Sequence, residues 1–408
     1  MTDETALRIA SLERQVELLT RLIAPGQQAV SDTPLPEELD MQAALADAVQ
    51  ALAPLKALLD DETVNDILIN GPKNVFVERF GKLEKTDLTF PNDAQVFLLA
   101  EAIANHIGRQ VNVRKPLLDA RLPDGSRVNV IVRPLAVDGT AISIRKFAKR
   151  SITLDHMASQ GNTSPQLSEL LKVIAHCRLN VLISGGTGSG KTTLLNAVSE
   201  HIDHAERIVT IEDAAELRLQ QPHVVRLETR PVRTDRNEDE VTIRDLMKNA
   251  LRMRPDRILV GETRGAEAFD MMQAMNTGHE GSITTIHANH PRDALARLEN
   301  MIMMANLNLP PQAIRSQIAS AIHVVIQVSR MKDGQRRVTF LSEVVGMEGD
   351  IITMQDLFTF QNKGEGADGK LAGEFKWSGI MPRFLRRVAY YGEAERLSNA
   401  LGVKLPKL

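Results

Sequence analysis

A glycine-rich octapeptide in the middle of the chain has the composition and spacing of a phosphate-binding loop. Residues 185–192 read Gly-Gly-Thr-Gly-Ser-Gly-Lys-Thr and match the pattern G-x-x-x-x-G-K-[ST] in full. The apolar residues 180–184 before it predict a strand, and residues 192–195 predict the start of a helix. Glycines let successive backbone N–H groups face one anion, and the helix N-terminus adds the positive end of its dipole. The predicted phosphate-binding residues are Gly185, Gly186, Thr187, Gly188, Ser189, Gly190, Lys191, Thr192 and Thr193.

Two side chains at the end of this loop have separate expected roles. Lys191 is expected to reach the β- and γ-phosphates of a nucleotide and to act in catalysis. The hydroxyl of Thr192 is expected to hold Mg²⁺, which prefers oxygen ligands and keeps several of its waters. The expected cofactors are therefore ATP and Mg²⁺. A glycine-rich turn that binds no nucleotide is the alternative.

Acidic residues follow two further apolar segments that predict buried strands. Residues 257–261 lead directly to Glu262, which we expect to orient or deprotonate the attacking water. Residues 208–211 lead to the adjacent Glu212 and Asp213, whose carboxylates suit Mg²⁺ bound through water. The alternatives are a surface glutamate that ends a strand and an acidic turn that caps a helix.

A histidine follows a fourth predicted strand. Residues 283–286 are mostly apolar and precede His287, whose imidazole could donate to the γ-phosphate or position the water. A purely structural histidine is the alternative. Because ligands bind outside the carboxyl ends of strands in open α/β sheets, we expect His287 near Glu262 and the glycine-rich loop.

Strands and helices alternate between residues 165 and 345, and the short apolar strands fit a buried, mostly parallel sheet. Residues 62–147 instead predict an α+β pattern, in which residues 93–107 form a helix with Asp93 as its N-cap. The expected organisation is a helix plus flexible linker at 1–37, a small helical module at 38–61, an N-terminal α/β domain at 62–148, an interdomain linker at 149–164 and a C-terminal ATPase domain at 165–408.

Composition excludes several classes of protein. The net charge of −3 argues against a protein that is basic throughout, and an aromatic content of 3% disfavours nucleic-acid binding by rows of stacked rings. The single cysteine, Cys177, excludes an intramolecular disulfide framework and a multi-cysteine zinc site. The sequence contains no run of 18 apolar residues, so no transmembrane helix is predicted. Residues 109–150 carry ten basic residues against three acidic ones, so positive charge is concentrated there.

The order of these motifs resembles the secretion and type IV pilus assembly ATPase superfamily, the type II/IV secretion ATPases. The loop at 185–192 is followed by an acidic box at 208–216, a Walker B segment that ends in Glu262, and a histidine box at 284–289. Gly261 departs from the pattern, because a magnesium-side aspartate usually stands there. The strings that are most similar to the Tad-pilus motor branch, the CpaF/TadA type, are residues 119–129, 142–147, 251–257 and 276–282.

The resemblance implies the fold class α/β: a RecA-like P-loop NTPase motor domain with an N-terminal α+β, PAS-like domain and a small helical N-terminal module. It further implies a homo-hexameric ring in which nucleotide lies between the two domains and N-terminal arginines engage the phosphates. By motif the catalytic arginines are Arg127 and Arg145, and Arg121 and Arg133 are further nucleotide-binding candidates.

The implied function is a cytoplasmic ATPase that powers assembly, or also retraction, of a Tad-type pilus or a related secretion system. Its implied partners are inner-membrane platform proteins, which would hold it at the cytoplasmic face of that membrane, and nucleic acid is not expected. Two other readings stay open. One is a nucleic-acid translocating ATPase whose basic residues bind the phosphodiester backbone, and the other is a scaffold that binds ATP without hydrolysing it.

Overall fold

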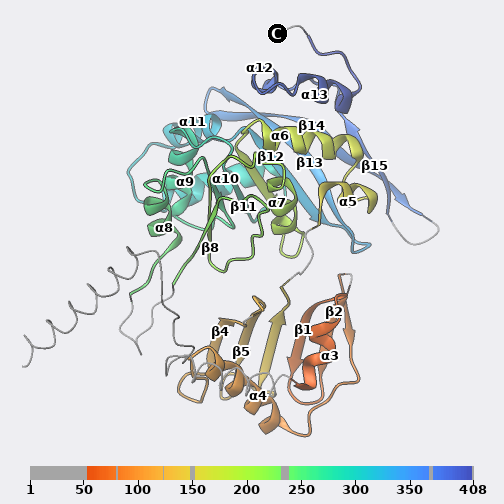
Figure 1. Cartoon of the computed structure of the whole chain (residues 1–408), viewed down its shortest axis with the longest axis vertical. Coiled ribbons are helices and arrows are strands. Elements are labelled where there is room, and N and C mark those ends of the chain that lie inside the picture. The colour runs from red at the N-terminus through yellow and green to blue at the C-terminus, as the bar shows by residue number, and fades with distance from the viewer. Residues whose placement is uncertain are drawn as a thin grey trace, which may run out of the picture.

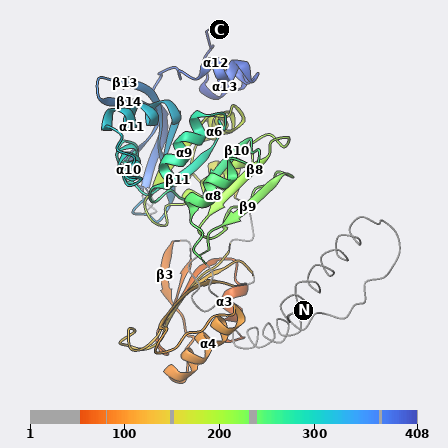
Figure 2. The same ribbon diagram turned by 90° about the vertical axis from the view of Figure 1, so that its left-hand side faces the viewer.

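The computed structural model describes residues 53–79, 81–122, 124–147, 152–230, 239–366 and 371–406. The helix and linker expected at 1–37, the first part of the module expected at 38–61, and residues 149–151 of the expected interdomain linker lie outside the described residues. The described strands form an N-terminal and a C-terminal sheet. Figures 1 and 2 show the N-terminal sheet at one end of the molecule and the last two helices at the other.

Antiparallel strands in the order β3-β2-β1-β6-β5-β4 make the N-terminal sheet. Their bounds are β1 Val64–Asn70, β2 Val75–Arg79, β3 Lys82–Lys85, β4 Leu117–Arg121, β5 Arg127–Ile131 and β6 Ala141–Arg145. Apolar residues alternate with polar ones along the central strands, so one face of the sheet is buried. This face shares its core with helix α4 (Asp93–His106), through residues such as Ala100 and Ile103.

The cap of α4 differs from the sequence-based expectation. The side chain of Asn92 accepts a hydrogen bond from the backbone N–H of Gln95, so Asn92 is the N-cap, and the prediction of Asp93 was wrong. Asp93 instead accepts from the backbone N–H of Thr140 at 2.7 Å. A Cβ on Gly139 would lie 2.8 Å from the same carboxylate oxygen. The acidic side chain therefore fixes a distant loop and leaves the capping to its neighbour.

The described end of the expected helical module belongs to the N-terminal core. A short 3₁₀ turn, η1 (Ala53–Leu55), leads into α3 (Lys56–Asp60). Leu55 is fully buried among the apolar residues of the N-terminal sheet. Residues 53–60 are thus packed on the sheet and not separate from it, because the side chain of Leu55 fills part of that core.

The C-terminal sheet has the strand order β15-β14-β13-β12-β7-β11-β10-β8-β9. The strands from β12 to β9 run parallel, and β13, β14 and β15 extend the sheet in antiparallel fashion. The bounds are β7 Val181–Gly185, β8 Ile208–Glu212, β9 Val224–Glu228, β10 Arg257–Val260, β11 Ile283–Ile286, β12 Val324–Arg330, β13 Arg336–Glu348, β14 Ile351–Glu365 and β15 Leu371–Trp377. The strands predicted at 208–211 and 283–286 are confirmed, and their parallel pairing brings their carboxyl ends to one edge.

Helices cover both faces of this sheet, which explains why strands β7, β8, β10 and β11 are buried along their whole length. Ile183 packs in a core with α5 (Leu154–Ser159), α6 (Pro165–His176), α7 (Lys191–Ser199), α12 (Leu385–Tyr390) and α13 (Ala394–Leu401). Its neighbour Leu182 points the other way, toward α8 (Ile243–Ala250), α9 (Glu267–Asn276), α10 (Pro291–Met303) and α11 (Pro311–Ala321). The α/β fold class is confirmed. Among the described helices, none combines the length and apolarity needed to span a bilayer.

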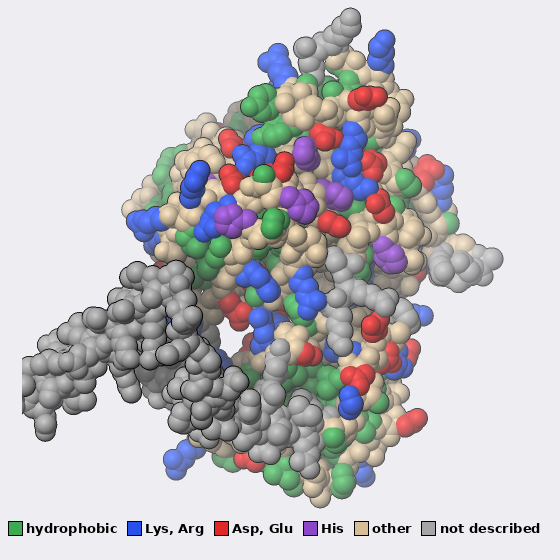
Figure 3. Space-filling model, viewed as in Figure 1, with side chains coloured by type: hydrophobic (Ala, Val, Ile, Leu, Met, Phe, Trp, Pro, Cys, Tyr) green, Lys and Arg blue, Asp and Glu red, His purple; other side chains and the backbone are tan. Residues whose placement is uncertain are grey.

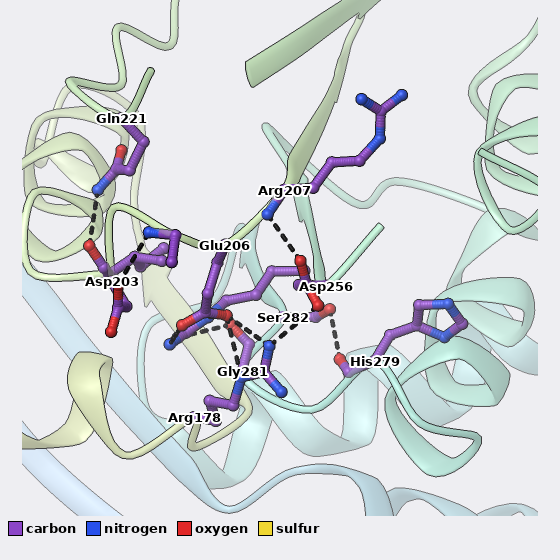
Figure 4. Close-up of polar contacts among 12 residues, drawn as sticks. Arg178, Asp203, Glu206, Arg207, Gln221, Asp256, His279, Gly281 and Ser282 are labelled. Atoms are coloured by element: carbon purple, nitrogen blue, oxygen red, sulfur yellow. Dashed lines mark hydrogen bonds and ion pairs between the residues drawn. The ribbon is translucent and has the colours of Figure 1, made fainter. Parts of the chain in front are cut away.

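A buried ion pair lies at the start of β10, at the opposite end of that strand from Glu262. The side chain of Arg257 is fully buried, and its Nε and Nη2 lie 2.7 and 2.6 Å from the two carboxylate oxygens of Glu206. Figure 4 shows Arg178 beside the same glutamate, at 2.8 Å. Burial alone would raise the pKa of Glu206, but the bonds and charges of Arg257 and Arg178 outweigh it and lower that pKa. Gly281 is required here, because a Cβ would lie 2.7 Å from Arg257 Nη1.

Replacing Arg257 with Ala should lower the free energy of unfolding by about 3–5 kcal/mol, because Glu206 would lose its main partner while still buried. Unfolding in urea, followed by circular dichroism, measures this loss. The matched control is Lys56→Ala, since Lys56 pairs with Asp60 in full solvent exposure and such pairs contribute about 0–1 kcal/mol. Equal losses of unfolding free energy in Arg257→Ala and Lys56→Ala would contradict the assignment of Arg257 and Glu206 as a buried, stabilising ion pair.

Candidate functional site

The predicted phosphate-binding residues 185–193 lie on the turn that joins β7 to α7 and on the first turn of that helix. Gly188 and Gly190 have φ angles of +67° and +98°, in the left-handed region that glycine adopts without strain. At Gly185, a Cβ would lie 2.4 Å from both Ser189 Oγ and the carbonyl oxygen of Val328. The local geometry thus requires glycine at these three positions of the motif.

Lys191 is folded back onto its own loop. Its Nζ donates to the carbonyl oxygens of Gly185 and Gly186, both at 3.1 Å. The residue is buried, and burial lowers its pKa while the charge of Glu262 partly opposes that shift. The ammonium group therefore lies inside the curve of the loop, where a phosphate would compete with the carbonyls for it.

A chain of charged and polar contacts connects Lys191 to the predicted catalytic and acidic residues. Its Nζ lies 3.4 Å from Nδ1 of His287, and Nε2 of His287 lies 2.9 Å from Oε1 of Glu262. The other oxygen of Glu262 accepts from Arg264 at 2.7 Å, and Arg264 also lies 3.3 Å from Asp213. The structure thus brings together four residues that the sequence places after four different strands.

The protonation of His287 follows from its neighbours. An ammonium group can only donate, so Nδ1 must accept from Lys191 and the ring proton sits on Nε2, facing Glu262. Burial and the positive charge of Lys191 lower the pKa of His287, while Glu262 opposes them. We infer a neutral imidazole at pH 7 that donates to the glutamate.

Glu262 is ionised in this setting. Burial would raise its pKa, but Arg264, His287 and Lys191 outweigh burial and lower it. Each carboxylate oxygen has one partner from the contacts above and therefore a further lone pair for a water molecule. The geometry suits a carboxylate that orients water next to the loop.

Glu212, which the sequence suggests as a residue that binds Mg²⁺ through water, is held by backbone N–H groups. It is buried, and its Oε2 accepts from the backbone N–H groups of Glu216 and Leu217 at 2.8 and 3.0 Å. A Cβ on Gly261 would lie 2.9 Å from Glu212 Cγ. The missing Walker B aspartate is thereby explained, because Glu212 fills the space that its side chain would need.

A cavity of about 170 Å³ lies between the two sheets and beside α7. Thr192 and Thr193 line it from the C-terminal side, and Arg127 and Arg145 line it from the N-terminal sheet, where they are directly opposite each other on β5 and β6. Arg127 lies 3.4 Å from Glu216, and Arg145 lies 3.1 Å from Asp66. On the face seen in Figure 3, Lys and Arg side chains gather at this junction.

The other two arginine candidates do not line this cavity. Arg121 on β4 pairs with Glu228 on β9 at 2.9 Å, which bridges the two sheets near the cavity. Arg133 lies beyond the far end of β5 and pairs with Asp93 at 3.7 Å. Within one chain, Arg133 therefore does not reach the phosphate loop.

Three residues of the site were missed from the sequence. Glu216 and Arg218 line the cavity, and the available signal was the acidic box at 208–216, which ends at Glu216 and lies two residues before Arg218. Arg218 stacks over the ring of Phe147, with 3.7 Å between its guanidinium carbon and the ring centre. Arg336 donates to the carbonyl oxygen of Gly188, and no local pattern connects it with the loop.

The donor set fits Mg²⁺ that arrives with a nucleotide. In the described part of the chain, no three His, Cys, Asp or Glu side chains converge to hold a metal ion. Mg²⁺ needs fewer protein ligands, since waters and substrate phosphates usually complete its shell. Thr192 lines the cavity, and Oε1 of Glu212 is a buried oxygen without a partner among the described residues.

The pH dependence of stability should reveal the burial of Glu212. Burial raises its pKa to about 7, from about 4.3 in an unfolded chain. Below both values each state carries the proton, whereas above pH 7 the folded state holds a buried charge, so stability falls as the pH rises through this window. In buffer with a chelator, the melting temperature of Glu212→Gln relative to the unmodified chain should rise from pH 5 to pH 8. The exposed substitution Glu395→Gln is the control, and a pH-independent difference would refute the expectation.

The comparison with a protein family and the comparison with individual proteins both point to secretion and transfer systems. Residues 48–364 match a family described as Type II/IV secretion system protein. The type IV secretion system protein PtlH of Bordetella pertussis is 37% identical over 327 residues, which cover 73% of this chain and 94% of PtlH. The conjugal transfer protein TrbB of Rhizobium radiobacter is 35% identical over 296 residues, which cover 71% of this chain and 86% of TrbB.

A similarity to a solved structure concerns the fold. The crystal structure of the pilus retraction motor PilT with bound ADP matches with a TM-score of 0.51 and 18% identity, over 86% of this chain and 89% of that chain. The expected RecA-like architecture is thus confirmed. The family match covers well over half of the chain, and the curated relatives exceed 30% identity over more than two thirds of it. This chain belongs to the type II/IV secretion system protein family.

Proposed function

We propose that the chain is the motor of a pilus or secretion machine, that it hydrolyses MgATP within a homo-hexameric ring, and that it belongs to the Tad-pilus type. The observation that carries this proposal is the cavity, which sets the first turn of α7 opposite Arg127 and Arg145 of the other sheet. A triphosphate bound there would contact both the N-terminal sheet and α7. Its cleavage therefore changes the contact between them, which is the basic requirement of a motor.

Binding would reorganise the loop around the phosphates. Lys191 exchanges the carbonyl oxygens of Gly185 and Gly186 for the β- and γ-phosphates, to which its charge is better matched. Thr192 would hold Mg²⁺, with Glu212 and Asp213 behind its waters, and the ion would neutralise charge on the phosphate oxygens.

Hydrolysis would depend on Glu262 and its partners. The ionised carboxylate orients the attacking water and takes up its proton, while the Nε2 proton of His287 keeps one oxygen in place. Arg127 and Arg145, from the same chain or from a neighbour in the ring, stabilise the charge that develops on the transferred phosphate.

Movement would come from a change of partner at Arg127. This guanidinium lies 3.4 Å from Glu216, across the junction between the sheets. A γ-phosphate in the same cavity competes with Glu216 for it and closes the cleft, and phosphate release lets the cleft reopen. The chain upstream of α5 (Leu154–Ser159) would act as the hinge, because α5 itself packs in the core of the C-terminal sheet.

The setting of the motor rests on the resemblance and on the relatives. PtlH is named as a type IV secretion system protein and TrbB as a conjugal transfer protein, which supports work on a cell-envelope machine. The strings at 119–129 and 142–147 support the Tad-pilus type. We therefore propose inner-membrane platform proteins as partners and a location at the cytoplasmic face of that membrane.

Replacing Glu262 with Gln should abolish hydrolysis and preserve ATP binding. Loss of a general base costs about 10²- to 10⁴-fold in turnover, whereas Gln keeps the size of the side chain and one of its two acceptor oxygens. Phosphate release gives turnover, and binding of a fluorescent ATP analogue gives affinity. Equal, near-zero turnover of the unmodified chain and the variant would leave only a scaffold that binds nucleotide.

Replacing Arg145 with Ala should reduce kcat by about 10²-fold or more, while the Kd for nucleotide stays within a few-fold. Arg145 is mostly exposed beside Asp66, so its removal should leave the fold intact. The control is Arg114→Ala, because Arg114 is exposed in the same basic segment and does not line the cavity. Unchanged kcat in Arg145→Ala would contradict the arginine clamp.

The ring itself can be tested directly. Electron microscopy of the purified chain with a non-hydrolysable ATP analogue should show six-fold rings that change shape when the nucleotide is removed. Monomers under all conditions, or rings that never change, would contradict the motor.

A further inference from the structure

A row of charged residues crosses the edge of the N-terminal sheet that faces the phosphate loop. In the strand register, the directly opposed pairs are Glu78 with Asp66, Asp66 with Arg145, Arg145 with Arg127, and Arg127 with Arg121. Opposed residues of an antiparallel pair point to the same face. The row is therefore negative on β2 and β1 and positive on β6, β5 and β4.

The C-terminal part presents the opposite charge to each end of this row. At the positive end, Glu228 lies 2.9 Å from Arg121, and Glu216 lies 3.4 Å from Arg127. At the negative end, Nη2 of Arg336 lies 3.4 Å from Glu78. The two faces are therefore complementary at both ends of the row.

Arg336 also contacts the phosphate loop. Its Nε donates to the carbonyl oxygen of Gly188 at 2.9 Å, and its Cδ would lie 3.2 Å from a Cβ on Gly190. Lys191 holds the carbonyls at the start of the loop, so Arg336 holds the part that Lys191 does not reach. One guanidinium thus joins the loop to the N-terminal sheet.

The two ends of the row differ in their relation to the cavity. Arg127 and Glu216 both line it, so a bound phosphate competes directly for their contact. Arg336 and Glu78 are not among the residues that line this cavity. Phosphate has no need to displace their contact, and when Lys191 turns toward a nucleotide, the bond from Arg336 to Gly188 can persist.

We propose that Arg336 is a positioning residue, which holds the phosphate loop through Nε and the N-terminal sheet through Nη2. The end of the row at Glu78 then serves as the pivot, and the end at Arg127 opens and closes with the phosphate. This inference rests on the proposed motor function and assigns its pivot. The negative end of the row keeps the two sheets in register while the positive end changes partners.

Substitutions of the full chain separate the two contacts of Arg336. Arg336→Ala removes both, so the Kd for a fluorescent non-hydrolysable ATP analogue should rise about tenfold, in line with the loss of one charge-assisted hydrogen bond, and kcat should fall as well. Glu78→Ala removes only the pivot, so Kd should stay within about twofold while kcat at saturating ATP falls about tenfold or more. Arg336→Lys can keep only one of the two contacts at a time, so its Kd should lie between the values for Arg336→Ala and Glu78→Ala.

The control is Arg396→Ala, which breaks an ion pair with Glu169 on the far helices α13 and α6 and should change neither constant. An unchanged Kd in Arg336→Ala, or a rise in Glu78→Ala as large as in Arg336→Ala, would overturn the proposal. If Arg336→Ala fails to fold, Arg336→Lys and Glu78→Ala decide in the same way. Analogue binding requires no turnover, so a chain that binds without hydrolysis would refute the motor and leave the loop contact measurable by Kd.

Discussion

The arrangement of the site depends on one continuous set of contacts that runs from Lys191 through His287, Glu262 and Arg264 to Asp213. Lys191, His287, Glu262 and Asp213 follow the carboxyl ends of β7, β11, β10 and β8, which is the order of these strands in the sheet. Parallel pairing ends the strands together, so groups from distant parts of the sequence meet without a long side chain. The neutral imidazole between the ammonium and the carboxylate lets both charges stay close to the loop.

The junction between the sheets adds a positive electrostatic field that the C-terminal sheet alone does not have. Arg127, Arg145 and Lys146 line the cavity from one side, Arg218 lines it from the other, and Glu216 is the acidic residue among its lining residues. Cations gathered in a partly closed space repel one another, and a polyanion relieves that repulsion. A triphosphate is therefore favoured over a neutral ligand of the same size. The same repulsion explains why each of Arg127 and Arg145 lies near a carboxylate, Glu216 and Asp66 respectively.

The parts of the fold that short segments encode could be predicted from the sequence, and the long-range contacts could not. The loop at 185–192 and the strands at 208–211 and 283–286 are defined by glycine spacing and apolar runs, which act within a few residues. By contrast, Gly261 makes sense only beside Glu212, whose side chain occupies the space next to it. The contact of Arg336 with Glu78 joins residues 258 positions apart. The N-cap of α4 shows the same limit. Asp93 accepts a hydrogen bond from the backbone N–H of the distant Thr140, and the neighbouring Asn92 caps the helix.

The basic segment at 109–150 also takes its meaning from tertiary contacts. Four of its arginines lie near acidic groups elsewhere in the sequence: Arg121 near Glu228, Arg127 near Glu216, Arg133 near Asp93 and Arg145 near Asp66. A duplex presents one negative charge per about 1.7 Å along its axis and needs cations spread along a surface. Here Arg127 and Arg145 instead converge on a cavity of about 170 Å³ beside the first turn of α7. Convergence of this kind suits a compact group with several charges, so the excess of positive charge supports a triphosphate more than a polymer of phosphodiesters.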